Sequence, residues 1–353
     1  MAQISAIGTA VPDHDIHQAF IGWARERLPD RERRLFDRMA ARAGIGRRWS
    51  VLPRGSDGGS PVAAGGFYAD AVLPGTADRM AIYAEAAPAL ALRSIAALAV
   101  KVPLDGITHL VVASCTGFVA PGIDQIVART LGLAPSVERL LVGFMGCYAA
   151  VAALRSARHI VRSDAGARVL VVTVELSTLH LQAAEAPEPL LAMLQFGDGA
   201  AAALVTAEGT GLAIDAPFAT TLPQSDQLIR WTITDQGFAM HLSGEVPGRI
   251  AQALAEPDFA HAALGGRAAD AVDGWAVHAG GRSILDAVER AYALPADALA
   301  ASRAVLADNG NMSSATLMFV LARVLDGPSV SHGVALAFGP GLAAEGFGFR
   351  HLT

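Results

Sequence analysis

LLVGFMGCYAAVAALRS, at residues 140–156, is the stretch on which the interpretation of this chain depends. Gly143 and Gly146 bracket two apolar residues just before Cys147, and small residues and good helix formers follow. This order predicts a strand or loop that ends at a glycine turn, with Cys147 in the first turn of a buried helix. The free backbone N–H groups and the dipole at a helix start favour thiolate over thiol. Cys147 is therefore a candidate nucleophile, although a small buried core residue explains this stretch alone equally well.

The composition limits the classes of protein to consider. The chain has 353 residues, of which 52% are hydrophobic and 17% charged, so it can bury a large core and is long enough for two fused or duplicated halves. A net charge of −6 without a basic run speaks against a nucleic-acid partner. The N-terminus has no signal-peptide pattern, and the apolar run 140–154 is shorter than the roughly 20 residues that span a bilayer. We expect a cytoplasmic protein without a membrane span.

Two cysteines, Cys115 and Cys147, are too few for a disulfide framework or a structural zinc site, and no metal site is expected. Cys115 comes just past a predicted buried strand, HLVVAS at 109–114. A packed residue at the strand end is the preferred interpretation of this second cysteine.

Strands and helices alternate along the whole chain, which predicts an α/β fold with buried sheets covered by helices. Segments 108–133 and 273–292 share one plan of strand, polar residue, glycine turn and helix, which suggests similar halves at 1–210 and 211–353. Further expected elements are strands at 2–10 and 167–176, and helices at 31–48, 77–100 and near 248–264.

Arg34, Arg38 and Arg42 recur at four-residue spacing and so align along one stripe of the helix expected at 31–48. A solvated face is the default interpretation of such a stripe. A polyphosphate partner is the functional alternative, because guanidinium groups suit phosphate oxygens.

Two polar residues sit where active-site side chains are commonly found. His278 ends a predicted strand directly before two glycines that open a helix, and this tight backbone can bring its ring to a cleft. Asn311 lies in an Asn-Gly-Asn turn before the helix start at Ser313 and Ser314. Considered alone, Asn311 is well explained as a cap or turn residue.

Taken together, these pieces resemble the type III polyketide synthases of the bacterial type, chalcone synthase-like enzymes of the thiolase superfamily. The resemblance covers nearly the full length of the chain. It rests on seven motifs in order, CTGFVAPG (115–122), GFMGCYAA (143–150), FGDGA (196–200), VPG (246–248), VHAGG (277–281), GNMSSA (310–315) and FGPG (338–341).

The resemblance implies a thiolase-like fold of five αβαβα layers built from two similar halves, and a homodimer. By position, Cys147 would be the acyl-carrying nucleophile, and His278 and Asn311 would complete the triad. Phe196 would be the aromatic gate between the CoA tunnel and the cavity. The positions that the family uses near CoA are Arg38, Arg42, Gly280, Gly281 and Ser283.

The resemblance also places a substrate pocket. Trp231 stands where plant chalcone synthases have a narrow glycine, and Ala120 replaces a methionine that a plant subunit inserts into its partner's cavity. A cavity filled on one side and opened on another suits a slim fatty acyl chain. The pocket positions are Cys115, Thr116, Ala120, Ser177, His180, Trp231 and Met240.

The implied activity is iterative decarboxylative Claisen condensation of malonyl-CoA onto an acyl-CoA starter held on Cys147, followed by cyclisation to a pyrone, resorcinol or phloroglucinol. Thiol, imidazole and amide suit acyl transfer and enolate stabilisation without a metal or cofactor, and the CoA thioesters are substrates. One alternative is a ketoacyl-ACP synthase III, which uses the same residue types. Another is a non-catalytic acyl-CoA-binding protein on the same fold.

Overall fold

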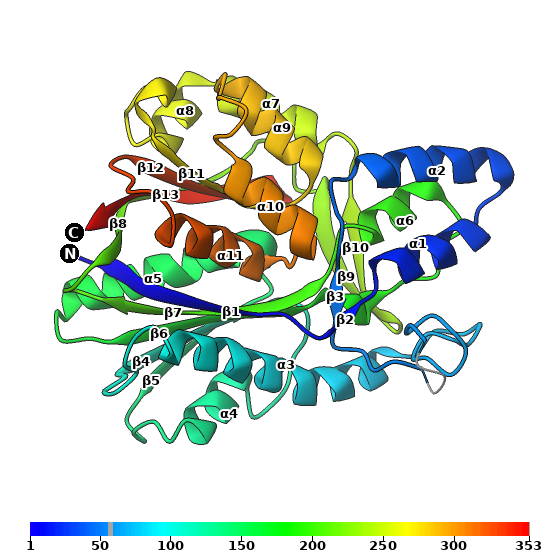
Figure 1. The fold of residues 1–353 in the computed structure, drawn as a ribbon, viewed down its shortest axis with the longest axis horizontal. Coiled ribbons are helices and arrows are strands. Elements are labelled where there is room, and N and C mark those ends of the chain that lie inside the picture. Colours follow the sequence, from blue (N-terminus) through cyan, green and yellow to red (C-terminus); the bar gives the residue numbers. More distant parts are fainter. Residues whose placement is uncertain (56–58, 353) are drawn as a thin grey trace.

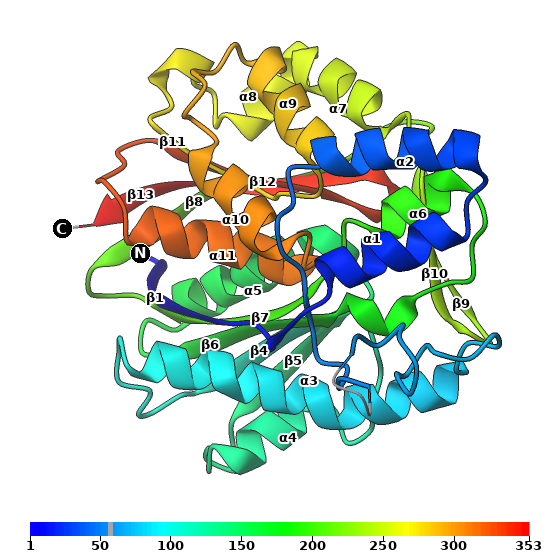
Figure 2. The same cartoon turned by 45° about the vertical axis from the view of Figure 1, so that its right-hand side comes forward.

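The computed structural model describes residues 1–55 and 59–352. Its elements stack in five layers, in which a central pair of helices lies between two parts of a sheet and further helices cover the outer faces (Figure 1, Figure 2). The central helices are α5 (Ala149–Ser163) and α11 (Ser314–Leu325). The outer helices are α3 (Thr76–Ala99) and α4 (Ile123–Thr130) on one side, and α7 (Val246–Ala255), α8 (Pro257–Ala263), α9 (Arg282–Ala291) and α10 (Ala300–Asn309) on the other.

Nine strands of the described chain form one continuous sheet in the order β11-β12-β13-β8-β1-β7-β6-β4-β5. The N-terminal part consists of β1 (Gln3–Ala10), β4 (His109–Ser114), β5 (Glu138–Gly143), β6 (Val169–Leu176) and β7 (Asp198–Thr206). The C-terminal part consists of β8 (Gly211–Thr221), β11 (Gly274–Val277), β12 (Gly333–Gly339) and β13 (Ala343–Leu352).

The two parts of the sheet repeat one pattern of strand directions. From β1 outward, two antiparallel contacts (β1–β7, β7–β6) precede a parallel one (β6–β4). From β8 outward, the same order appears in β8–β13, β13–β12 and β12–β11. Only two residue pairs join β1 to β8, namely Gln3 with Ala213 and Ile4 with Leu212.

Burial explains why these stretches are strands. All eight residues of β6 are buried, because the central helices cover one face of the sheet and α3 covers the other. By length and composition α3 could cross a membrane, but it packs on β1, β6 and β7 as a core helix, so this is weak evidence for a span.

The predicted strands at 2–10 and 167–176 and the helix at 77–100 are confirmed within a few residues. The helix expected at 31–48 is shorter, because α2 (Asp30–Arg42) ends before Gly44, whose φ is 74°. The helix expected near 248–264 is two helices, since Pro257 cannot continue α7.

The remaining elements gather at the end of the sheet where the candidate site lies (Figure 1). A two-stranded ribbon of β9 and β10 stands there, next to helices α1, α2 and α6. The bounds are α1 (His17–Glu26), α6 (Pro187–Met193), β2 (His14–Asp15), β3 (Trp49–Ser50), β9 (Ile229–Thr234) and β10 (Gly237–Leu242).

Candidate active site

Cys147 lies in a single 3₁₀ turn, Gly146–Tyr148, between β5 and the start of α5. This is the strand, glycine turn and helix predicted from the sequence. Gly146 has a φ of 74°, and a Cβ built on it would lie 2.5 Å from Cδ of Pro340. A side chain at position 146 would therefore strain the turn and displace the Pro340 ring, so the turn that presents Cys147 requires glycine.

The resting protonation state of Cys147 differs from the expectation. Burial raises the pKa of the thiol to about 12, and hydrogen bonds with Ser313 and Asn311 lower it only partly. Burial also lowers the pKa of His278 to about 3. Without substrate the pair is therefore a neutral thiol and a neutral imidazole, because desolvation outweighs the effect of the helix start.

Asn311 connects the other two members of the predicted triad. Its Nδ2 donates to the backbone oxygen of Gly280 at 3.2 Å, and its Oδ1 accepts from the Ser313 N–H at 2.8 Å. His278 follows β11, and its Nε2 lies 3.3 Å from a Cβ built on Gly280. Asn311 thus contacts Cys147 and the Gly280 backbone beside His278, and so brings together the start of α5, the end of β11 and the start of α11.

His278 is buried, and neither of its ring nitrogens has a hydrogen-bond partner in the described part of the chain. A buried polar group without a partner is unusual in a folded protein. Both nitrogens are therefore free to exchange a proton with a thiol or to donate to a substrate oxygen.

A second polar cluster lies behind Cys147. The Glu175 carboxylate accepts from the backbone N–H of Cys115 at 3.0 Å and from the Thr116 hydroxyl at 2.9 Å. Cys115 Sγ is 3.2 Å from the Ser313 hydroxyl oxygen. Ser313 has a φ of 47°, a strained backbone for a residue with a side chain, and its hydroxyl contacts both cysteines. Cys115 and Thr116 are thus buried behind the nucleophile.

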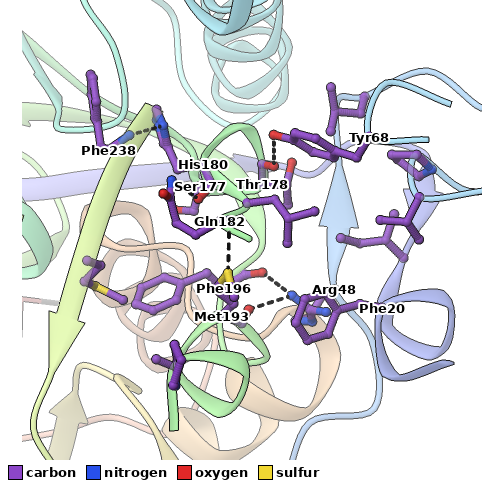
Figure 3. Close-up of a pocket in the computed structure, with 18 of the residues that line it drawn as sticks. Phe20, Arg48, Tyr68, Ser177, Thr178, His180, Gln182, Met193, Phe196 and Phe238 are labelled. Atoms are coloured by element: carbon purple, nitrogen blue, oxygen red, sulfur yellow. Dashed lines mark hydrogen bonds between the residues drawn. The ribbon is translucent and has the colours of Figure 1, made fainter. Parts of the chain in front are cut away.

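A small apolar cavity of about 90 Å³, which is partly open to solvent, lies next to this site (Figure 3). Phe196 and Trp231 contribute to its wall, with ring centroids 6.4 Å apart. Trp231 pairs directly with Met240 across the β9–β10 ribbon, and its Nε1 lies 3.9 Å from a Cβ built on Gly146. Trp231 therefore stands between the Cys147 turn and the cavity.

Five of the predicted gate and pocket residues line this cavity, namely Phe196, Ser177, His180, Trp231 and Met240. His180 is held in place, because Nε2 lies 2.7 Å from the Thr116 oxygen and Nδ1 accepts from the Phe238 N–H at 3.0 Å. Its ring stacks on Phe238 with centroids 4.2 Å apart. Ala120 is exposed and does not line the cavity of its own chain, so its expected place at the partner's cavity stays a prediction.

The open space of the cavity lies towards the N-terminal elements. Its far wall is formed by α1, by residues 60–62 and 68, and by the inner side of α6. The sequence motifs did not indicate this direction.

Comparisons with known proteins place the chain in a family. The family model for the N-terminal domain of chalcone and stilbene synthases matches residues 1–209, and the model for their C-terminal domain matches residues 213–353. The chain belongs to the chalcone and stilbene synthase family. It is a type III polyketide synthase, an acyltransferase-type condensing enzyme, as the motifs predicted.

Individual relatives agree with this family. The chain is 34% identical to the alpha-pyrone synthesis polyketide synthase-like Pks18 of Mycobacterium tuberculosis over 287 residues, which covers 77% of this chain and 72% of the relative. It is 32% identical to the bisdemethoxycurcumin synthase of Oryza sativa subsp. japonica over 378 aligned residues, which covers 98% of this chain and 91% of the relative.

Solved structures of the family share the fold. PKS-I of the brown alga Ectocarpus siliculosus matches with a TM-score of 0.87 and 30% identity, covering 99% of this chain and 98% of that one. The C-terminal type III polyketide synthase domain of Steely1 from Dictyostelium matches with a TM-score of 0.88 and 24% identity, covering 100% of this chain and 99% of that one. The thiolase-like fold is confirmed, and both halves match polyketide synthases, which favours this interpretation over a ketoacyl-ACP synthase III.

A polyketide synthase also needs an entrance for its thioester substrates, and the residues predicted to bind CoA are only partly together. Arg42 and Ser283 line one surface cleft, between the end of α2 and the start of α9. Arg38 lies one turn earlier on α2 and lines a different hollow, with Arg31 and Arg34. Gly280 and Gly281 are buried beneath the start of α9.

Sequence reasoning missed four polar residues of this synthase. Glu175 and Ser313 surround the two cysteines, Arg282 adds a cation to the cleft, and Arg48 donates to the Phe196 backbone oxygen at 2.7 Å. Ser313 and Arg282 lie in or beside quoted motifs, GNMSSA and VHAGG, and could have been found there. Glu175 and Arg48 carried no local signal.

Proposed function

We propose that this synthase loads a fatty acyl group onto Cys147 and extends it with malonyl-CoA to a product that cyclises to a pyrone, resorcinol or phloroglucinol. The observation that carries the proposal is the meeting of Cys147, Asn311 and His278 beside an apolar cavity. The family uses malonyl-CoA and acyl-CoA substrates. The mycobacterial relative, whose name specifies alpha-pyrone synthesis, supports the product class.

Loading begins from the neutral pair. The Cys147 thiol passes its proton to His278 as sulfur attacks the thioester carbonyl of the starter. The C–S bond to CoA then breaks, and the CoA thiolate takes the proton back from the imidazolium. Hydrogen bonds from Ser313 and Asn311 stabilise the thiolate while it exists.

Extension requires an enolate. Malonyl-CoA loses CO₂ and leaves negative charge on its thioester oxygen. A ring N–H of His278, which has no competing acceptor in the described chain, and the Nδ2 amide of Asn311, held near Gly280, act as donors to that oxygen. The enolate carbon attacks the Cys147 thioester carbonyl and forms the new C–C bond. The C–S bond to Cys147 breaks, so the acyl chain ends on the malonyl-derived unit and Cys147 leaves as a thiolate that can be acylated again. These steps use only residues of the chain and the thioesters, so we expect no metal or cofactor.

The starter prediction follows from the shape of the cavity. Trp231 and Phe196 are in edge-to-face contact in the cavity wall, and the space beside them is lined mostly by aliphatic and aromatic side chains. A slim alkyl chain fits there better than a coumaroyl ring. We expect a higher kcat/KM for lauroyl-CoA than for coumaroyl-CoA, by about tenfold, the effect of nearly two additional buried methylenes at about 0.8 kcal/mol each. A preference for coumaroyl-CoA in product assays would overturn the fatty starter.

Trp231→Gly tests the same wall directly. Glycine removes the indole between the Gly146 turn and the cavity, so bulky starters or longer products should appear. Met240→Leu, which keeps the bulk opposite Trp231, is the matched control and should leave the starter profile nearly unchanged. If both variants gave the profile of the unmutated enzyme, Trp231 would not set the starter.

CoA binds in the cleft of Arg42 and Ser283, with Arg282 as a further cation. Arg42→Ala should raise KM for malonyl-CoA about three- to tenfold with little change in kcat, because phosphate contacts are present in ground and transition states alike. Arg38→Ala, one turn away in another hollow, should have the smaller effect. A malonyl-pantetheine thioester, which lacks the nucleotide and its phosphates, should have the same KM in Arg42→Ala as in the unmutated enzyme. If KM for this truncated substrate rose as much as KM for malonyl-CoA, Arg42 would not contact the CoA phosphates.

The protein acts as a homodimer through β5, in the cytoplasm where its thioester substrates are made. β5 is the last strand at its end of the sheet, and Leu140 and Leu141 on it are 43% and 46% exposed. Phe118, whose ring contacts Phe144 just after β5, is 49% exposed. An apolar sheet edge of this kind pairs readily with a second copy. Sedimentation should give a dimer at micromolar concentration, and Leu140→Glu with Leu141→Glu should give monomers. An active monomer of the unmutated chain would refute this.

A further inference from the structure

Arg48 is a buried cation in the wall of the apolar cavity. It is 2% exposed and lies over the Phe20 ring, with Cζ 4.7 Å from the centroid. Nη1 donates to the backbone oxygens of Met193 and Phe196, and Nε donates to His17 Nδ1 at 3.1 Å. These bonds hold the guanidinium in one orientation.

The second terminal nitrogen of Arg48 is not used by these hydrogen bonds. Nη2 is buried and has no hydrogen-bond acceptor in the described ranges. Two carboxylates are near, but each is bound to other donors. Asp15 accepts from the N–H groups of His17 and Arg48, and Asp198 accepts from Val51 and Thr178. An unpaired buried N–H of a charged group is costly and points to an acceptor that the chain does not supply.

The surroundings define which acceptor fits. Figure 3 shows Arg48 beside Phe20, on the opposite side of the cavity from His180 and Phe238. Ser177, 7% exposed, also lines the cavity with a hydroxyl that has no partner. Asp15 and Asp198 already act on the Arg48 charge, so a neutral oxygen is favoured over a further carboxylate.

We propose that Arg48 binds a hydroxyl oxygen near the far end of the starter, so that the synthase prefers hydroxylated fatty acyl chains to plain ones of equal length. This rests on the proposed function, in which the chain reaches from Cys147 past the Phe196 and Trp231 pair into the cavity. The hydroxyl accepts from Nη2–H at one end of an otherwise apolar chain. Arg48 is then a specificity-determining residue as well as a support for Phe196.

The first experiment measures binding without chemistry. In the Cys147→Ala variant, titration calorimetry compares octanoyl-, decanoyl- and dodecanoyl-CoA with their ω-hydroxy forms. At the length that reaches Arg48, the hydroxylated thioester should bind about tenfold more tightly than the plain one. Equal or weaker binding of every hydroxylated form overturns the proposal, as does tighter binding of an ω-carboxylate than of the hydroxyl.

The second experiment assigns the preference to Arg48. Arg48→Lys should reduce the ratio of kcat/KM for hydroxylated over plain starter to near one. Arg79→Lys is the matched control and should keep the ratio. Arg79 is also buried, donates to the Leu179 and Leu181 oxygens and has an unpartnered Nη2, but it does not line the cavity. If Arg48→Lys lost activity with both starters equally, so that the ratio of kcat/KM did not change, Arg48 would only support Phe196. That result would overturn the proposal.

Different results would refute the fatty starter and the Arg48 hydroxyl site. Hydroxylated chains that bind tightly but are never condensed would refute the fatty starter and leave the Arg48 site standing. Plain chains that are condensed as well as hydroxylated ones would refute the Arg48 site and leave the fatty starter. If Arg48→Lys does not fold, the comparison of starters on the otherwise unmutated protein still decides.

Discussion

Cys147→Ala is expected to abolish product formation, while Cys115→Ser retains appreciable activity. Cys147 is only partly buried at a helix start, and its thiol contacts Ser313 and Asn311. Alanine removes the only atom that can carry the acyl chain there, so turnover should fall by at least about 1000-fold. Cys115 is fully enclosed, and burial and the Glu175 carboxylate raise the pKa of its thiol well above the usual value. It is a poor nucleophile.

Intact-protein mass spectrometry after incubation with lauroyl-CoA provides the measurement. One acyl adduct should form on the unmutated enzyme and on Cys115→Ser, and none on Cys147→Ala. Serine at 115 keeps a hydroxyl where Cys115 Sγ contacts Glu175 and Ser313, so the cluster should stay intact. An adduct that peptide mapping assigns to Cys115 would show that the nucleophile is the wrong cysteine.

The fold was largely predictable because its signals are local. The eight buried residues of β6, six of them apolar, and the 24-residue helix α3 have patterns typical of a covered strand and a packed helix. The Cys147 turn was predictable for the same reason, since Gly143, Gly146 and the small residues that follow lie within one short stretch. The triad came from motifs that place His278 and Asn311 at element ends. The division into halves at residue 210 stays a prediction.

The rest of the site depends on contacts between distant parts of the chain. Glu175 meets Cys115 across 60 residues and Ser314 across 139, and no local pattern indicates either contact. The shape of the cavity depends on how His180 is held by Thr116 and Phe238, contacts that join segments about 60 residues apart. The thiolate prediction for Cys147 was wrong because burial cannot be measured from a sequence.

Asn311→Asp is expected to stop extension while loading continues. The change is isosteric and keeps an oxygen for the Ser313 N–H, but it replaces the Nδ2 donor with a second oxygen. An enolate forming beside that oxygen loses a hydrogen bond and meets negative charge. Decarboxylation of malonyl-CoA should therefore fall by about 100- to 1000-fold, the usual range for loss of one such donor. Transfer of lauroyl from CoA to Cys147 should fall less, because this step forms no enolate and Ser313 still stabilises the thiolate when the Asn311 hydrogen bond is lost.

Two assays separate these steps in the same samples: release of CO₂ from malonyl-CoA, and acylation of Cys147 by lauroyl-CoA. Asn309→Asp is the matched control, because Asn309 is a buried amide two residues away whose Nδ2 donates to the Val305 oxygen at 3.1 Å. It should keep both activities if the turn tolerates a carboxylate. Equal losses in the two variants would mean that the turn has been disturbed. Unchanged CO₂ release from Asn311→Asp would remove Asn311 from the enolate site and leave His278 as its donor.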